Sequence, residues 1–258
     1  MKKIINFAKY STIKIGQEEE VTLLTKENPI PPKNAVILGG CSNILLSTTP
    51  PPLVMLSKEF DYIKIKDDLL YVGGATPNGK LFSFCKKNNI ANFEFLSHLP
   101  GKMGGTIKMN AGMKAYEIFD NLVSIKTTNG VLNKKDITYD YRYTNIEDIV
   151  LEARFQIMQG FDEKKVLMFK KMRSNQPKEF SAGSCFKNPP NNFAGKLIEE
   201  VGFKGKRYGD MAFSPIHANF LINYGNGTYK EAIELINAVK AEVKTKRGIE
   251  LELEIRVI

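Results

Sequence analysis

The feature that most constrains the fold of this chain is a change in its hydrophobic period near residue 160. Before that point, short apolar runs alternate with polar residues or stand between turn signals, as in the segment 62–72, which predicts strands and a hairpin. After it, Val166, Phe169 and Met172 recur at the spacing of one helix face. A strand-rich half followed by a helix-rich half is typical of an α+β protein with two domains.

The expected helices and strands follow from these periods and from capping residues. Helices are expected over residues 77–88, 162–173, 192–202 and 228–248, the last with the capping pair Thr228 and Glu231 and a closing Gly248. Strands are expected over residues 12–15, 36–38, 62–65, 69–72, 149–157 and 249–258. We therefore expect a first domain over 1–160, with subdomains over about 1–57 and 58–160, and a smaller α+β domain over 161–258.

Composition excludes several classes of protein. An apolar content of 43% and a charged content of 25% over 258 residues are those of a globular protein, and no apolar run is long enough to span a bilayer. Three cysteines without a C-x-x-C pair argue against a disulfide framework and a thiolate zinc site, and favour a reducing, cytosolic compartment. The net charge of +9 comes from scattered lysines, so a lysine-rich proteome explains it better than a nucleic-acid partner. An anionic small-molecule substrate is a third explanation of that charge.

Two glycine-rich stretches indicate a phosphate-bearing ligand. The segment Pro100–Gly112 holds four glycines in thirteen residues, and the segment Gly39–Asn43 follows an apolar run that reads as a buried strand. Glycine places no side chain between a ligand and the backbone N–H groups, so such loops can face a diphosphate. Neither stretch matches the dinucleotide-binding or P-loop signature, and each alone is more often a plain tight turn. Together they favour one extended ligand held by two loops.

Further segments carry candidate catalytic groups. Arg142 stands among tyrosines, either as a solvated cation stacked on a ring or as a fixed cation for a carboxylate or phosphate. Ser184 follows a glycine on a predicted turn, whereas the neighbouring Cys185 has no evident partner to lower its pKa and is expected to be a buried structural residue. His98 and His217 are the only histidines, so neither a Ser-His-Asp set nor a metal site is expected.

The last segment of the chain, 249–258, reads as a strand with one apolar and one charged face. On such a strand Glu254 and Arg256 project from the same face, roughly 7 Å apart at about 3.3 Å per residue. Glu250 and Glu252 lie on that face too, so it is either a solvated surface or part of a site. The periodicity does not decide between the two.

These motifs occur in an order that resembles the UDP-N-acetylenolpyruvoylglucosamine reductase family. The resemblance runs from about Ser11 to the C-terminus and rests on Gly39–Asn43, Pro100–Gly112, Tyr141–Thr144, Gly183–Pro189, Ala194–Glu199, His217–Phe220 and Glu254–Arg256. Thr144 leads almost directly into the strand expected over 149–157. The chain therefore resembles the shorter type II form, which lacks an inserted segment bearing a substrate-closing tyrosine.

The resemblance implies an FAD-binding domain of the vanillyl-alcohol-oxidase (PCMH) type, followed by a smaller α+β substrate-binding domain. It implies noncovalent FAD, NADPH as hydride donor, and conversion of UDP-N-acetylenolpyruvoylglucosamine to UDP-N-acetylmuramate for bacterial peptidoglycan. It also implies a cytoplasmic bacterial monomer that acts on a UDP-sugar, with no nucleic-acid or membrane partner.

The family's functional residues carry over to matching positions of this chain. The resemblance implies three catalytic residues that act on one substrate: Arg142, Ser184 and Glu254. It implies FAD contacts from Gly39, Gly40, Cys41, Ser42, Asn43, Pro100, Gly101, Gly104, Gly105, Asn110 and Arg256. It implies substrate contacts from Tyr141, Lys187 and Asn188, and no metal ligand.

The chain departs from the family pattern at three positions. Cys41 stands where glycine is common, and Gln17 follows Gly16 where a second glycine is common. Asn175 stands where a substrate-binding lysine is common, and we expect a nearby lysine to substitute. The last departure puts one phosphate or carboxylate contact in doubt.

Two other classes of function remain open at this stage. One is a different FAD oxidoreductase on the same fold, which a covalent flavin or a fast reaction with oxygen would indicate. The other is a basic binding module without catalysis, which a colourless protein that binds nucleic acid would indicate. The combination of Arg142, Ser184 and Glu254 favours the reductase over both.

Overall fold

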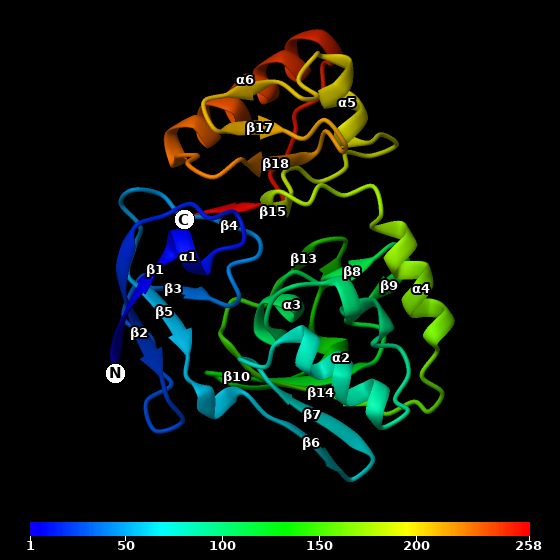
Figure 1. The fold of residues 1–258 in the computed structure, drawn as a ribbon. Coiled ribbons are helices and arrows are strands. Elements are labelled where there is room, and N and C mark those ends of the chain that lie inside the picture. The colour runs from blue at the N-terminus through cyan, green and yellow to red at the C-terminus, as the bar shows by residue number, and fades with distance from the viewer. The chain divides into compact units, whose positions relative to one another are not determined.

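The computed structural model describes all residues, 1–258, and the chain folds as two compact units. Unit 1 comprises Met1–Lys3, Val21–Gly40 and Pro52–Ser174, and unit 2 comprises Ile4–Glu20, Cys41–Pro51 and Asn175–Ile258. Each unit combines helices with a mainly antiparallel sheet, so the predicted α+β class is confirmed (Figure 1).

Unit 1 is built on a five-stranded antiparallel sheet in the order β11-β10-β14-β7-β6. Its strands are β6 (Ile63–Lys66), β7 (Leu69–Gly73), β10 (Leu122–Thr127), β11 (Gly130–Asn133) and β14 (Val150–Gln156). The predicted β6–β7 hairpin turns at Asp67 and Asp68, whose φ of 50° and 58° suit a two-residue turn. Helix α3 (Met103–Lys108) packs on β7 and β14, and this places the second glycine-rich stretch on the sheet.

The other elements of unit 1 lie around this sheet. They are α2 (Asn78–Lys87), α4 (Glu163–Met172), β3 (Val36–Leu38), β5 (Leu53–Leu56), β8 (Gly112–Met113), β9 (Tyr116–Glu117), β12 (Tyr139–Asp140), β13 (Tyr143–Thr144), η1 (Lys58–Phe60), η2 (Glu94–His98) and η3 (Lys134–Asp136). Strands β1 (Lys2–Asn6) and β2 (Glu18–Leu24) belong to both units and complete a second sheet in the order β1-β2-β5-β3.

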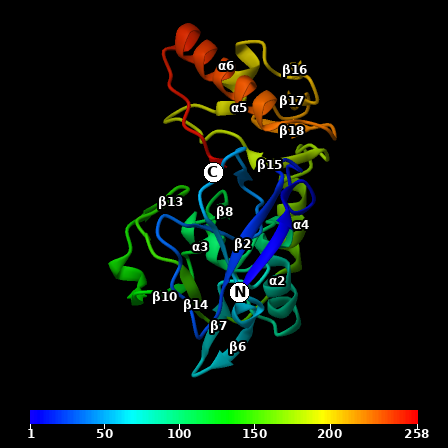
Figure 2. The same cartoon turned by 90° about the vertical axis from the view of Figure 1, so that its left-hand side faces the viewer.

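Unit 2 has a four-stranded antiparallel sheet in the order β15-β18-β17-β16, with α6 packed on it (Figure 2). Its elements are β15 (Phe180–Ser184), β16 (Arg207–Tyr208), β17 (Met211–Phe213), β18 (Phe220–Asn223), α1 (Phe7–Tyr10), α5 (Ala194–Glu200), α6 (Tyr229–Arg247), β4 (Ile44–Leu45) and β19 (Arg256–Val257). Helix α6 begins with the predicted capping box of Thr228 and Glu231, and ends at Gly248 with φ of 68°.

The compact units differ from the predicted division at residue 160. Phe169 of α4 packs edge-on against Tyr116 at 5.2 Å, so α4 belongs to the core of unit 1. Ile13, Ile15 and Leu45 are buried in the core of unit 2, which explains why two N-terminal segments join it. The functional division into a cofactor domain over 1–160 and a substrate domain over 161–258 stays a prediction.

Two predicted strands are wrong. Residues 12–15 form bends and an irregular segment, because Lys14 has φ of 60° while Ile13 and Ile15 are both buried. The strand expected over 249–258 is reduced to β19, which pairs in parallel with β4.

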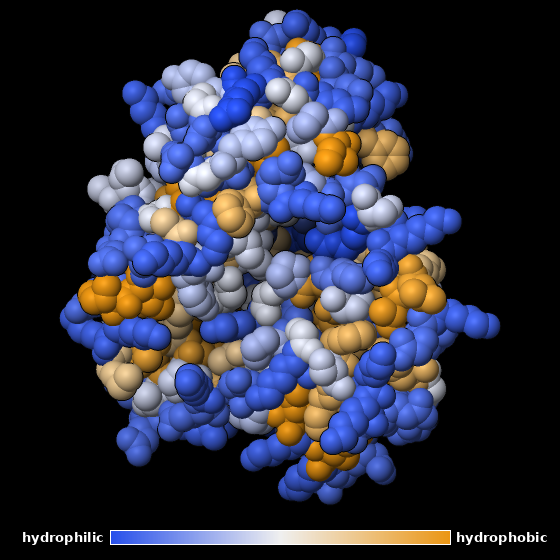
Figure 3. Space-filling model, in the orientation of Figure 1, coloured by the Kyte–Doolittle hydropathy of each residue, from blue (hydrophilic) through white to orange (hydrophobic).

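Apolar side chains on the face drawn in Figure 3 lie in separate patches. No helix is long and apolar enough to cross a bilayer.

Candidate functional site

The two glycine-rich stretches meet within unit 1. A Cβ built on Gly40 would lie 2.9 Å from the Cα of Gly101, so the two backbones approach more closely than any other residue would allow. Gly101 has φ of 128°, a conformation that residues with a side chain rarely adopt. The close approach agrees with the prediction that both loops serve one ligand. That they bind FAD is a separate prediction.

The two adjacent glycines in α3 have different surroundings. A Cβ on Gly104 would lie 3.2 Å from the carbonyl oxygen of Gly74 and 3.3 Å from that of Val150, so Gly104 faces the protein backbone. Gly105 is exposed, and a Cβ there would meet no atom within 4 Å. Of the two, Gly105 is therefore the one whose missing side chain leaves room for a ligand.

The backbone at Cys41 suits the glycine that the resemblance implies at this position. Cys41 has φ of 49°, in the left-handed region that favours glycine. Its side chain is buried, and its carbonyl oxygen accepts a hydrogen bond from the backbone N–H of Thr12 at 3.2 Å. Cys41 therefore holds a left-handed backbone conformation that glycine adopts more easily.

Arg142 lies at the turn of the β12–β13 hairpin and has φ of 56°. Its guanidinium donates to the carbonyl oxygen of Gly112 at 2.9 Å and reaches that of Asn110 at 3.5 Å. The same group stacks over the ring of Tyr141 at 4.9 Å. The cation therefore stacks on a tyrosine, as one alternative predicted, and is held against the end of the second glycine-rich stretch; its role as a cation for a carboxylate or phosphate stays a prediction.

Asn110, beside Arg142, is fully buried and keeps an unused acceptor. Its Nδ2 donates to the carboxylate of Glu117 at 2.6 Å and to the carbonyl oxygen of Asp140 at 3.2 Å. Its buried Oδ1 has no hydrogen-bond partner. A buried acceptor without a partner is costly unless a ligand supplies a donor. The orphan acceptor fits a ligand that carries hydroxyl or N–H donors, and the glycine approach and the open side of Gly105 leave room for its phosphates; FAD has both kinds of group.

The end of the chain bends at Glu254 instead of continuing as a strand. The carbonyl oxygen of Cys185 accepts hydrogen bonds from the backbone N–H of Glu254 at 2.9 Å and of Ile255 at 3.3 Å. Two successive N–H groups cannot point at one acceptor from a regular strand, because alternate groups point in opposite directions. The prediction that Glu254 and Arg256 project from the same face of one strand is therefore wrong.

Asn43, a predicted cofactor contact, is tied to this bend. Its Nδ2 donates to the carbonyl oxygen of Glu254 at 2.9 Å, and its own carbonyl oxygen accepts from the backbone N–H of Arg256 at 3.0 Å. The end of the first glycine-rich stretch and the two candidate residues of the C-terminal segment thus form one hydrogen-bonded cluster in unit 2.

Ser184 ends β15, directly before this cluster. The β15–β18 ladder is irregular between Ser181 and Ser184, where Gly183 has φ of 83°. The neighbouring Cys185 is completely buried, and burial, followed by the charge of Glu254, raises the pKa of its thiol. A neutral, buried thiol is a poor nucleophile, which agrees with the structural role expected for Cys185.

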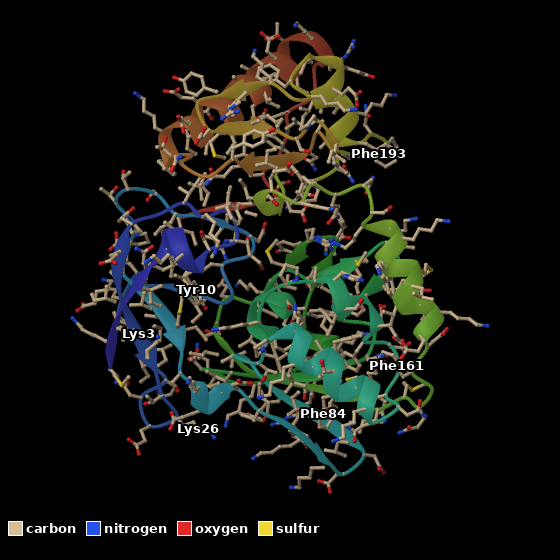
Figure 4. The ribbon with its side chains drawn as sticks, in the orientation of Figure 1. Lys3, Tyr10, Lys26, Phe84, Phe161 and Phe193 are labelled. Carbon is tan, nitrogen blue, oxygen red and sulfur yellow. The ribbon has the colours of Figure 1, made fainter.

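The predicted substrate contacts Lys187 and Asn188 follow Ser184. The Nζ of Lys187 lies 2.6 Å from a carboxylate oxygen of Glu252, and its backbone N–H donates to the carbonyl oxygen of the same residue. The Oδ1 of Asn188 accepts from the backbone N–H of Ala194 at 3.0 Å, so its Nδ2 is the group left to donate to a ligand. Phe193, which is labelled in Figure 4, immediately precedes α5 and is 68% exposed.

The candidate residues are divided between the two units. Unit 1 holds Gly39, Gly40, Pro100, Gly101, Gly104, Gly105, Asn110, Tyr141 and Arg142, and unit 2 holds Cys41, Ser42, Asn43, Ser184, Lys187, Asn188, Glu254 and Arg256. No group of three or more His, Cys, Asp or Glu side chains could hold a metal ion. Sequence reasoning missed the buried Asn219, which contacts Phe186; the motif His217–Phe220 was the available signal.

Comparisons with known proteins identify the family. A model of the family described as UDP-N-acetylenolpyruvoylglucosamine reductase, C-terminal domain, matches residues 176–258. The reductase of Helicobacter hepaticus is 45% identical over 99% of this chain and 98% of its own length. That of Campylobacter jejuni is 41% identical over 99% of this chain and 100% of its own length. The crystal structure of the Thermus caldophilus reductase has a TM-score of 0.89 at 28% identity, covering 100% of this chain and 98% of that one.

The relatives match along almost the whole chain, including both units, and the solved reductase shares its complete fold. The chain therefore belongs to the UDP-N-acetylenolpyruvoylglucosamine reductase family and is an FAD-dependent oxidoreductase that uses NADPH to form UDP-N-acetylmuramate in peptidoglycan synthesis.

Proposed function

We propose that Arg142, Ser184 and Glu254 carry the second half of this reaction, the reduction of the enolpyruvyl group. Bound FAD would supply the hydride for C3 of that group, with NADPH as its source. Negative charge then develops on the substrate carboxylate, and C2 needs a proton. The protein has to stabilise that charge and deliver that proton.

Arg142 is proposed as the fixed cation for the developing charge. A preorganised donor lowers the barrier because it does not have to reorient as the charge forms. The two carbonyl contacts and the stacked ring of Tyr141 restrict the guanidinium, which supports this role. The left-handed backbone of Arg142 also supports it, since strained residues cluster at functional sites.

Ser184 is proposed as the acid that protonates C2. A serine hydroxyl is a weak acid, so it serves only an acceptor as basic as an enolate. Glu254 is proposed to orient the reacting group or to share a proton with the enol. The observation that carries this assignment is the carbonyl of Cys185, the residue after Ser184, which holds the N–H groups of Glu254 and Ile255.

The remaining assignments extend this proposal. Residues 39–43 of the first glycine-rich stretch and Pro100, Gly101, Gly104 and Gly105 of the second are proposed to contact the diphosphate of noncovalent FAD, and Asn110 and Arg256 to contact FAD as well. Tyr141, Lys187 and Asn188 are proposed to contact the UDP-sugar. We also propose a monomer in the bacterial cytoplasm, because one chain supplies every proposed residue and NADPH is a cytoplasmic reductant; light scattering of the holoenzyme tests the monomer.

The test of the assignment separates the two half-reactions for Ser184→Ala and its neighbour Cys185→Ala. Ser184→Ala should leave the reduction of FAD by NADPH nearly intact and slow the oxidation of the reduced flavin by substrate, by roughly the 10²–10⁴-fold that a general acid contributes. Cys185→Ala should change both rates little in the folded protein. A large loss in Cys185→Ala with little change in Ser184→Ala would reverse the assignment.

A further inference from the structure

The buried side-chain amide of Asn219 hydrogen-bonds to the backbone of Phe186, in the segment Ser184–Phe186 that carries the candidate serine. It immediately precedes β18 and is only 4% exposed. Its Oδ1 accepts from the backbone N–H of Phe186 at 3.0 Å, and its Nδ2 donates to the carbonyl oxygen of the same residue at 2.8 Å. The side-chain amide therefore pairs with Phe186 much as a neighbouring strand would.

The backbone of Asn219 holds the residue before Phe186. The N–H of Cys185 donates to the carbonyl oxygen of Asn219 at 2.7 Å, while the N–H of Asn219 donates to Nδ1 of His217 at 3.3 Å. The strand ladder itself ends one residue earlier, where Ser184 pairs with Phe220. Asn219 thus continues the pairing beyond the ladder, and it fixes the two residues that follow Ser184.

The same segment supports Glu254 from its other edge. The carbonyl oxygen of Cys185 accepts from Glu254 and Ile255, so the peptide after Ser184 is bonded on both sides. A displacement of Phe186 would pass to Cys185 and Ser184, because the peptide groups of Cys185 are hydrogen-bonded on both sides and cannot absorb the shift by rotating about φ and ψ without breaking those bonds. A displacement of about 1 Å at a reacting group costs about 10²-fold in rate.

We propose that Asn219 is a positioning residue for Ser184, acting in the substrate half-reaction; this rests on the proposed role of Ser184 as proton donor. It touches neither substrate nor cofactor in this role. Its amide keeps the serine hydroxyl where the proton is needed, through the backbone of Cys185 and Phe186.

The chain contains a matched control in the same strand. Asn223, at the other end of β18, is 1% exposed. Its Nδ2 donates to the carbonyl oxygen of Ile13 at 2.9 Å, and its Oδ1 accepts from the N–H groups of Gly225 and Gly227, each at 2.8 Å. It pairs with Phe180, the far end of β15 from Ser184. Replacing it removes a similar buried amide whose side chain hydrogen-bonds to neither Cys185 nor Phe186.

The experiment uses the holoenzyme with Asn219→Asp, Asn223→Asp, Ser184→Ala and the double variant Ser184→Ala with Asn219→Asp. Aspartate keeps the shape and the acceptor but loses the Nδ2 donor, so it disturbs packing least. Both half-reactions are measured in single turnovers. Amide hydrogen exchange at Phe186 reports directly on the hydrogen bond from Phe186 to the side chain of residue 219. Asn219→Ala provides a second variant.

In Asn219→Asp we expect FAD reduction by NADPH within about twofold of wild type, and oxidation by substrate slowed by about 10- to 100-fold. Exchange at Phe186 should be faster in Asn219→Ala, which removes the acceptor of its N–H, and Asn223→Asp should leave both half-reactions within about twofold. The double variant should be no slower than Ser184→Ala, because residues that act as one unit are not additive. The proposal is overturned by a substrate half-reaction near the wild-type rate, by an equal loss in Asn223→Asp, or by losses that multiply in the double variant. If Ser184→Ala itself keeps its rate, the proton-donor role fails first, and the positioning role falls with it.

Discussion

Replacing Gly105 by valine should weaken FAD binding without weakening the fold. Gly105 is exposed in α3, and a Cβ there meets no atom within 4 Å, so the apoprotein has room for the side chain. The matched control is Gly79→Val, because Gly79 is also an exposed glycine near the start of a helix with no atom within 4 Å. Gly104 would be a poor choice, since its Cβ would press on the carbonyl oxygens of Gly74 and Val150.

The expected change in stability has two sources, the helix propensity of the new residue and the stabilisation by bound FAD. Glycine and valine differ in helix propensity by only about 0.5 kcal/mol, so neither variant should change the free energy of unfolding of the apoprotein by more. FAD at 100 times its Kd stabilises the folded protein by about 2.7 kcal/mol. If valine at position 105 weakens FAD binding tenfold, that stabilisation falls by about 1.4 kcal/mol. For a chain of this size the Tm of the FAD-saturated protein then drops by about 3–6 °C.

The assay is a titration of deflavinated protein with FAD, followed by flavin fluorescence, with thermal unfolding before and after saturation. Gly105→Val should bind at least tenfold more weakly, and Gly79→Val should match wild type. If Gly105→Val folds and keeps the wild-type Kd and the full Tm increase, then α3 does not face the cofactor and the loop assignment is wrong.

The other predictions concern the proposed catalytic residues, pH and Cys41. Arg142→Lys should slow single-turnover oxidation of the reduced flavin by substrate by about 10²–10³-fold, because a point ammonium loses the two-pronged contact; Glu254→Gln should also slow it, and rates near wild type in both would remove these residues from the mechanism. Burial is the main cause that lowers the pKa of His98 and His217 below 6.5, so the unfolded chain binds protons that the folded chain does not. The free energy of unfolding should therefore be highest above pH 6.5 and fall as the pH drops from there towards the folded-state pKa values, and replacing both histidines by glutamine should flatten that dependence in urea titrations at several pH values. Cys41→Gly should keep its FAD content and change the free energy of unfolding by no more than about 1 kcal/mol, because relief of the left-handed strain offsets the lost side-chain burial; an absorbance ratio and a urea titration measure both.

Local sequence signals were enough for the elements that depend on neighbouring residues. The capping box at Thr228 and the closing Gly248 predicted both ends of α6, and the pair Asp67-Asp68 predicted the β6–β7 hairpin. The ordered motifs also predicted the family, which the relatives confirm. Caps, tight turns and hydrophobic periods act over a few residues, so the sequence displays them directly.

Tertiary contacts decided what the candidate residues can do. The approach of Gly40 to Gly101 joins two loops that are far apart in the chain, and the carbonyl of Cys185 turns the predicted last strand into the bend that carries Glu254. Asn219 looks like any polar residue beside a strand until Phe186 is placed against its amide. By itself, the sequence determined α2, α4, α5 and α6, the hairpin and the types of residue available for flavin chemistry, but not the short helices α1 and α3. Only the tertiary structure decided which of their polar groups are paired and which remain able to bind, because that depends on hydrogen bonds between residues far apart in the chain.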